Sequence, residues 1–158
     1  MPVHGQPHLI KAGGSAAAGW AAALGGRVTI SLAYNHVVWE VSLHPEVEAW
    51  FIELCRTDPV TADRVAEAVD LLAEHGPALG RPLVDRLKGS LFHNMKELRP
   101  GSTGGSEIRM IFAFDPFREA VFLVAGDKSG RWQDWYETAI PLADARFDEH
   151  LKLLKEDE

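Results

Sequence analysis

Residues 107–136 have the sequence EIRMIFAFDPFREAVFLVAGDKSGRWQDWY. Two apolar runs within it, Glu107–Phe114 and Arg118–Ala125, have the length and composition of buried strands. They are separated by Asp115-Pro116-Phe117, which is typical of a turn. This stretch therefore predicts a hairpin of two buried strands, with the second strand central in its sheet because both of its faces are apolar.

Cationic side chains interrupt the stretch at few positions. Arg109 lies inside the first strand, and Lys128 and Arg131 follow the second. Aromatic residues then recur at i, i+3 and i+4 from Trp132, which places them on one face of a helix. Cations beside aromatic rings at the end of a sheet suit a ligand made of phosphates and bases, which indicates RNA.

Composition limits the class of protein. With 158 residues the chain has the size of one domain with a core of its own. It has no run of eighteen apolar residues, so we expect no transmembrane helix. The single cysteine, Cys55, excludes an internal disulfide and suits the reducing cytoplasm. Because Cys55 falls on a predicted helix, a buried inert thiol is favoured over a nucleophile.

The charge of the chain is unevenly distributed. A net charge of −7 argues against a general nucleic-acid binder. Residues 86–131, however, hold eight Lys and Arg against five Asp and Glu, and the segments on both sides are acidic. This distribution favours one local basic site, with an ordinary, unevenly charged surface as the alternative.

Residues 1–37 differ from the rest of the chain. The segment Ala12–Gly26 consists almost wholly of Ala and Gly, which bury little apolar surface and lose much entropy on ordering. We therefore expect a disordered extension before a domain at residues 38–158. A signal peptide is a competing interpretation, weakened by glycines in the apolar centre. Translation from an upstream start codon is another.

Two helices are expected near the start of the domain. Residues Trp39–Leu43 alternate apolar and polar side chains, as an edge strand does. His44-Pro45 then opens a helix whose apolar residues recur at i, i+3, i+4 and i+7 from Val47. Asp58-Pro59 opens a second helix, which Gly76-Pro77 ends. The short turn between the helices predicts an antiparallel helical hairpin.

The second half of the chain completes the expected order of elements. Leu91–Arg99 is typical of a mixed strand, and the flexible loop Pro100–Ser106 joins it to the next strand. A short helix is expected over residues 131–139, ended by Pro141, and a last helix over residues 142–154. The predicted order is strand, helix, helix, three strands and the C-terminal helices.

Arg109 is the strongest candidate for a site residue. An arginine between apolar neighbours in a central strand is costly unless it is paired or serves a site. The structural explanation is an ion pair with Glu97 on the neighbouring strand, and the functional one is a phosphate clamp; both can hold at once. Lys96 and Arg99 lie on the same hairpin and become candidates with it, although each can also be a solvated strand residue.

Weaker candidates surround this hairpin. Lys128 lies in a GDKSG loop without the glycine spacing of a P-loop, so structural and functional roles are equally supported. Trp132 and Trp135 suit a core better than a ligand platform, whereas Tyr136 has a hydroxyl suited to contact a base. His93 is the one histidine expected on a strand of the cationic sheet.

The sequence contains no Ser/His/Asp signature, no histidine pair at metal-ligand spacing and no acidic metal cluster. We therefore expect neither a metal ion nor another cofactor. The remaining chemistry is that of cations near a phosphodiester, with a basic or phenolic group for proton transfer. With RNA, the ribose 2′-hydroxyl can itself be the nucleophile.

Five motifs point to a known family. They are Leu87-Lys88-Gly89, Lys96-Glu97-Leu98-Arg99, Arg109 with Ala113-Phe114-Asp115-Pro116, GDKSG at residues 126–130, and Ala139-Ile140-Pro141-Leu142-Ala143. With these motifs and this order of elements, the chain from Trp39 to Leu154 resembles the RelE/ParE toxin superfamily. It is most similar to the HigB-like branch of phage-derived toxins.

The resemblance implies an α+β fold of the RelE type, with a small antiparallel sheet packed against an N-terminal helical hairpin and with C-terminal helices. It implies the toxin of a type II toxin–antitoxin system, a metal-independent endoribonuclease. Such a toxin cleaves mRNA on translating ribosomes by attack of the 2′-hydroxyl, which leaves a cyclic phosphate. The implied partners are a helix-turn-helix antitoxin of the HigA type, mRNA and the ribosome, in the cytoplasm.

The resemblance also implies roles for single residues. The implied catalytic residues are Arg109, which stabilises the transition-state phosphate, Lys96, Arg99, Lys128 and, more loosely, Tyr136. The nearby Lys88, Arg131 and His93 are expected to bind RNA. Two alternatives remain: a non-catalytic ParE-like inhibitor of DNA gyrase, and an inactive relative that only binds its antitoxin.

Overall fold

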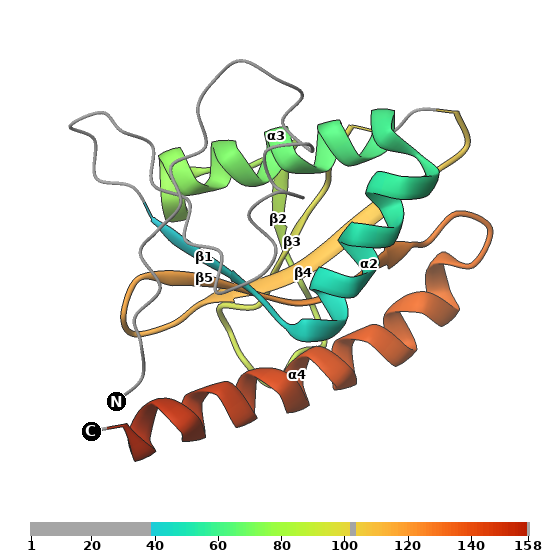
Figure 1. The fold of residues 1–158 in the computed structure, drawn as a ribbon. Helices are drawn as coiled ribbons and strands as arrows, with labels where there is room; N and C mark the ends of the chain where they lie inside the picture. Colours follow the sequence, from blue (N-terminus) through green and yellow to red (C-terminus); the bar gives the residue numbers. More distant parts are fainter. Residues whose placement is uncertain (1–38, 102–103, 158) are drawn as a thin grey trace.

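The computed structural model describes residues 39–101 and 104–157, so the expected N-terminal extension lies outside the described residues. The described elements, in chain order, are β1 (Glu40–Leu43), α2 (Pro45–Thr57), α3 (Pro59–His75), the 3₁₀ turn η1 (Gly76–Ala78), β2 (Val84–Arg86), β3 (Lys96–Leu98), β4 (Ile108–Phe114), β5 (Glu119–Asp127) and α4 (Trp132–Glu156). Helix α4 runs along the opposite side of the sheet from α3 (Figure 1).

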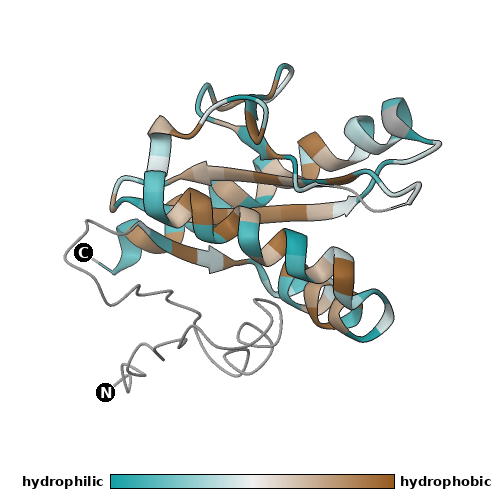
Figure 2. Cartoon of the chain, turned by 90° about the horizontal axis from the view of Figure 1, so that it is seen from above, coloured by the Kyte–Doolittle hydropathy of each residue, from teal (hydrophilic) through white to brown (hydrophobic). Residues whose placement is uncertain are grey.

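The sheet confirms the predicted α+β class. Its five strands have the order β1-β5-β4-β3-β2, and all neighbours are antiparallel except β1, which pairs parallel with β5. The predicted hairpin is β4 and β5, joined at the expected turn and central in the sheet. These central strands are largely brown in the hydropathy view of Figure 2, as buried strands should be.

The helical hairpin also forms where the sequence predicts it. The His44 side chain accepts a hydrogen bond from the Glu46 amide at 3.1 Å and so caps α2. Asp58 caps α3 by accepting from the Thr61 amide at 3.2 Å. One core cluster joins the apolar faces of both helices to one face of the sheet. It includes Val47, Phe51, Val65, Val69, Leu72, Met110, Phe112 and Phe122.

Helix α4 differs from the prediction, because it continues through Pro141 where we expected two helices. The proline is exposed, so its missing N–H costs the helix a hydrogen bond where water can replace it. On the inner side, Ala139, Ala143 and Phe147 pack on the second face of the sheet and hold both halves in line. Among the helices that the structure describes, none has the length and apolar character needed to cross a membrane.

The strand expected over Leu91–Arg99 is shorter than predicted, since only Lys96–Leu98 pairs in the sheet. The Ser90 hydroxyl and the Leu91 amide donate to the Asp144 carboxylate on α4, the latter at 2.9 Å, and this draws the chain away from the sheet. Strand β2 was not predicted, because three residues with two charged side chains carry no readable alternation.

Candidate functional site

The alternation of β4 separates two faces of the sheet. Ile108, Met110 and Phe112 belong to the core under the helical hairpin, and Ile111 belongs to the core under α4. Arg109 therefore lies on the α4 side, opposite to Ile108, Met110 and Phe112. Glu97 is the register partner of Ile111, so the carboxylate of β3 lies on that side as well.

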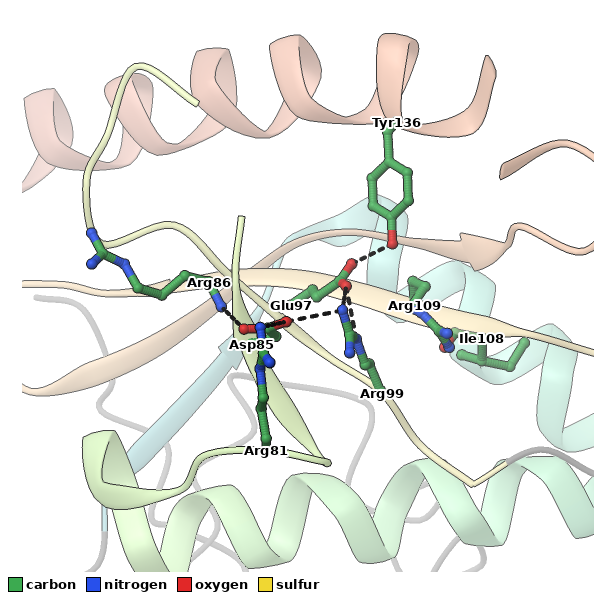
Figure 3. A network of polar contacts seen from close by, with 8 residues as sticks. All are labelled: Arg81, Asp85, Arg86, Glu97, Arg99, Ile108, Arg109 and Tyr136. Atoms are coloured by element: carbon green, nitrogen blue, oxygen red, sulfur yellow. Dashed lines mark hydrogen bonds and ion pairs between the residues drawn. The ribbon is translucent and has the colours of Figure 1, made fainter. Parts of the chain in front are cut away.

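Glu97 is the centre of a polar network on this side of the sheet (Figure 3). Its carboxylate is buried, with 2% of the residue exposed. The side chain of Tyr136 extends from α4 toward the sheet, and its hydroxyl donates to Oε2 of Glu97 at 2.6 Å. Nε of Arg99 donates to Oε1 of the same carboxylate at 2.8 Å. Arg99 also contacts Asp85 at 3.2 Å. One buried carboxylate thus fixes the positions of a phenol and a guanidinium.

Arg109 does not form the ion pair with Glu97 that we considered as its structural explanation, because Arg99 is the residue that pairs with Glu97. One terminal nitrogen of Arg109 donates to the carbonyl of Ile108 at 2.8 Å. Its Nε is buried and, within the part of the chain that the structure describes, has no hydrogen-bond partner. An unsatisfied buried donor of this kind costs about 1–3 kcal/mol. It marks a position where a ligand acceptor would be favourable.

Lys128 and Tyr136 meet beside this arginine. The ammonium group of Lys128 lies 5.3 Å from the centroid of the Tyr136 ring, within the range of a cation–π contact. The ring of Trp135 meets the Tyr136 ring edge-on at 5.0 Å. Three of the predicted catalytic residues, Arg109, Lys128 and Tyr136, are therefore close together, with Arg99 tied to them through Glu97.

The environment of Tyr136 sets the protonation of its hydroxyl. Burial raises the pKa of the phenol well above its ordinary value of 10.0, and the hydrogen bond to Glu97 and the charge of that carboxylate raise it further. The guanidinium of Arg109 acts in the opposite direction. The phenol therefore keeps its proton at neutral pH and can donate a hydrogen bond.

A glycine makes room for the aromatic pair. Gly126 is the register partner of Arg109. A Cβ at Gly126 would lie 2.8 Å from Nε1 of Trp135, which is closer than real side chains approach. The indole therefore packs on the bare backbone of β5 and fixes the start of α4 beside the site. This placement agrees with the core role predicted for Trp135.

Three other predicted site residues lie apart from this cluster, and a fourth lies at its edge. Lys96 points to the opposite face of the sheet, where its Nζ lies 5.8 Å from the Phe114 ring. Lys88 and His93 are exposed between β2 and β3, and His93 lies in a turn rather than on the strand we expected. Arg131 is the exposed residue before α4, at the rim of the cluster.

The sequence identified Glu97 only as a possible partner of Arg109, and its bond to Tyr136 was missed. The two residues are 39 positions apart, and no local pattern links them. The strand alternation could have indicated the other contact of Glu97, its pairing with Arg99, because these two residues are two positions apart and share a face.

Residues 53–148 match the family model described as phage derived protein Gp49-like, and the chain belongs to this family. No solved structure matches the chain.

Two relatives come from Mycobacterium tuberculosis, and both are named as inferred toxins. HigB2 is 49% identical over 122 residues, which cover 77% of this chain and 59% of HigB2. HigB3 is 51% identical over 111 residues, which cover 70% of this chain and 92% of HigB3. The chain thus spans little more than half the length of HigB2 and nearly all of HigB3. The predicted resemblance to HigB-like toxins is confirmed.

Proposed function

We propose that the chain is the toxin of a type II toxin–antitoxin system and that it acts as a metal-independent mRNA endoribonuclease. The names of its relatives support the toxin role. The observation that carries the enzymatic role is the half-buried side chain of Arg109 beside Tyr136 and Lys128, with one of its nitrogen donors unsatisfied among the described residues. A donor of that kind suits an acceptor that arrives with the substrate, and a phosphate oxygen is the acceptor that a guanidinium matches best.

The proposed reaction is attack of the ribose 2′-hydroxyl on the adjacent phosphorus. The 2′-hydroxyl proton leaves to water, the bond to the 5′-oxygen of the next nucleotide breaks, and that oxygen takes up a proton from water, which leaves a 2′,3′-cyclic phosphate and a 5′-hydroxyl. Negative charge grows on the non-bridging oxygens in the transition state, and Arg109, Arg99 and Lys128 supply the positive charges that stabilise it.

Tyr136 and Glu97 have separate roles in this proposal. Because its pKa is raised, Tyr136 cannot act as a base at neutral pH; its one proton is donated to Glu97, so it donates to the phosphate or the leaving oxygen only by exchanging that bond for one to the substrate. Glu97 holds Tyr136 and Arg99 in place, since both donate to its oxygens. It is a positioning residue, because it is too deeply buried to reach the substrate.

The proposed partners are the translating ribosome and an antitoxin. A net charge of −7 gives little general attraction to RNA, so the mRNA is best presented by a larger assembly, and we propose the translating ribosome. A helix-turn-helix antitoxin of the HigA type is the proposed neutralising partner, by analogy with the HigB relatives.

Mapping of mRNA ends on translating ribosomes tests the proposal. Purified full-length chain should produce new 5′-hydroxyl ends and cyclic phosphates without added metal ion. A supercoiling assay with DNA gyrase should show no inhibition. Intact mRNA with inhibited supercoiling would instead establish the gyrase-directed alternative. Intact mRNA, normal supercoiling and retained antitoxin binding would establish the inactive relative.

A further inference from the structure

A second cluster of polar side chains lies near the other end of α4, away from Tyr136. It contains Asp115 from the β4–β5 turn, Glu119 from the start of β5 and His150 from α4. One ligand atom from each residue lies within 4.8 Å of the other two. Asp115 and His150 are 35 positions apart, so only the tertiary structure brings them together.

The spacing of these atoms suits a metal ion. Nε2 of His150 and Oδ2 of Asp115 are 2.9 Å apart. This is a hydrogen-bond distance, and two donors that bind one ion at ~2.1 Å lie only slightly further apart, at ~3.0–3.4 Å, so an ion can replace the shared proton after a small shift of the side chains. Glu119 adds a carboxylate oxygen within 4.8 Å of both atoms, so a bound ion would draw the three ligand atoms closer together.

The two carboxylates of the cluster are buried. The Asp115 side chain is fully buried, and Glu119 is 7% exposed. Two carboxylates and one imidazole therefore offer oxygen and nitrogen ligands in a small volume that is largely closed to bulk water. A divalent cation would neutralise both carboxylates while binding His150 in its neutral form.

The donor atoms are already oriented. Oδ1 of Asp115 accepts from the amides of Phe117 at 2.9 Å and Glu119 at 3.0 Å, which leaves Oδ2 directed at the imidazole. The His150 ring stacks on Phe147 at 6.3 Å between centroids. His150 also lines a cavity of about 390 Å³ between β1 and α4, which gives an ion and its water ligands a path to the cluster.

We propose that Asp115, Glu119 and His150 bind one divalent transition-metal ion of the zinc type, with water in the remaining positions. One imidazole and two carboxylates are a donor set that such ions accept. The bound ion joins the C-terminal half of α4 to the β4–β5 turn and so stabilises the fold. The site takes no part in the proposed RNA cleavage, and its test does not depend on that activity.

Zinc titration of the metal-stripped full-length chain, by equilibrium dialysis and calorimetry, tests the proposal. The wild type should bind one more zinc ion than His150→Gln, and zinc should raise the melting temperature of the wild type only. This difference isolates the site, since both proteins keep the other six histidines of the chain. His93→Gln, which removes an exposed histidine, should bind zinc as the wild type does.

A second variant keeps the test independent of folding. Glu119→Gln leaves the hydrogen bond between Asp115 and His150 intact, and it should weaken zinc binding by at least about tenfold, the loss that follows removal of even an outer hydrogen-bond partner in metal sites. Circular dichroism confirms that each variant is folded. Equal zinc stoichiometry and affinity in the wild type, His150→Gln and Glu119→Gln would overturn the proposal.

Discussion

The Tyr136 hydroxyl donates a hydrogen bond of 2.6 Å to Oε2 of Glu97 and so joins α4 to β3 across the sheet. Arg99 occupies the other oxygen of the same carboxylate. The buried Glu97 therefore ties the phenol and the guanidinium to one point beside Arg109 (Figure 3). The geometry of the proposed catalytic site depends on this one carboxylate more than on any contact between the cations themselves.

Replacing Tyr136 with Phe should lower the free energy of unfolding by about 1–3 kcal/mol, because it leaves one oxygen of a buried carboxylate without its donor. Urea denaturation measures the change. In a Glu97→Gln background the same substitution should cost less, since a neutral amide is less costly to leave unpaired. Equal costs in both backgrounds would show that the two side chains are not coupled.

Stability should fall at alkaline pH through Tyr136. Its folded-state pKa is raised, so the folded protein holds the phenolic proton more tightly than the unfolded chain does. The resulting stabilisation is complete below the ordinary value of 10.0 and is lost as the pH rises above it. Tyr136→Phe should lack this loss when both proteins are denatured on either side of pH 10.0. Parallel pH dependence in the two proteins would contradict the assignment.

Replacing Gly126 with Ala should destabilise the fold by about 1–3 kcal/mol, because the new methyl group would displace the indole of Trp135. Gly105→Ala is the matched control, since a Cβ there meets nothing within 4 Å. It should change stability by less than about 1 kcal/mol. Tryptophan fluorescence during urea denaturation reports both effects. Equal stability of the two variants would count against the packing of Trp135 on β5.

The elements that the sequence predicts well are those with a strong local pattern. Residues close together in the sequence determine the apolar runs of β4 and β5 and the capped starts of α2 and α3. The errors occur where tertiary contacts override local preference. Packing of Ala139 and Ala143 on the sheet carries α4 through Pro141, and Asp144 draws residues 90 and 91 away from the strand we expected.

Some residues of the candidate site could be predicted from their sequence neighbours, and others could not. An arginine in an apolar strand is conspicuous, so Arg109 could be identified from its neighbours alone. Lys96 was wrongly grouped with Arg99, because three positions separate them and the alternation of a strand places them on opposite faces. Glu97 was considered as a possible partner of Arg109, and it pairs instead with Arg99 and Tyr136, a choice that only the packed structure decides.

The most direct test compares Arg109→Ala with Lys96→Ala in cleavage of mRNA on translating ribosomes. The two side chains lie on opposite faces of adjacent strands, so they form a matched pair of lost cations. Loss of Arg109 should slow cleavage by about 10²–10³-fold, the effect of losing one transition-state donor, and Lys96→Ala should cleave at the wild-type rate. Cleavage by Arg109→Ala at the wild-type rate, or a larger loss in Lys96→Ala, would contradict the account.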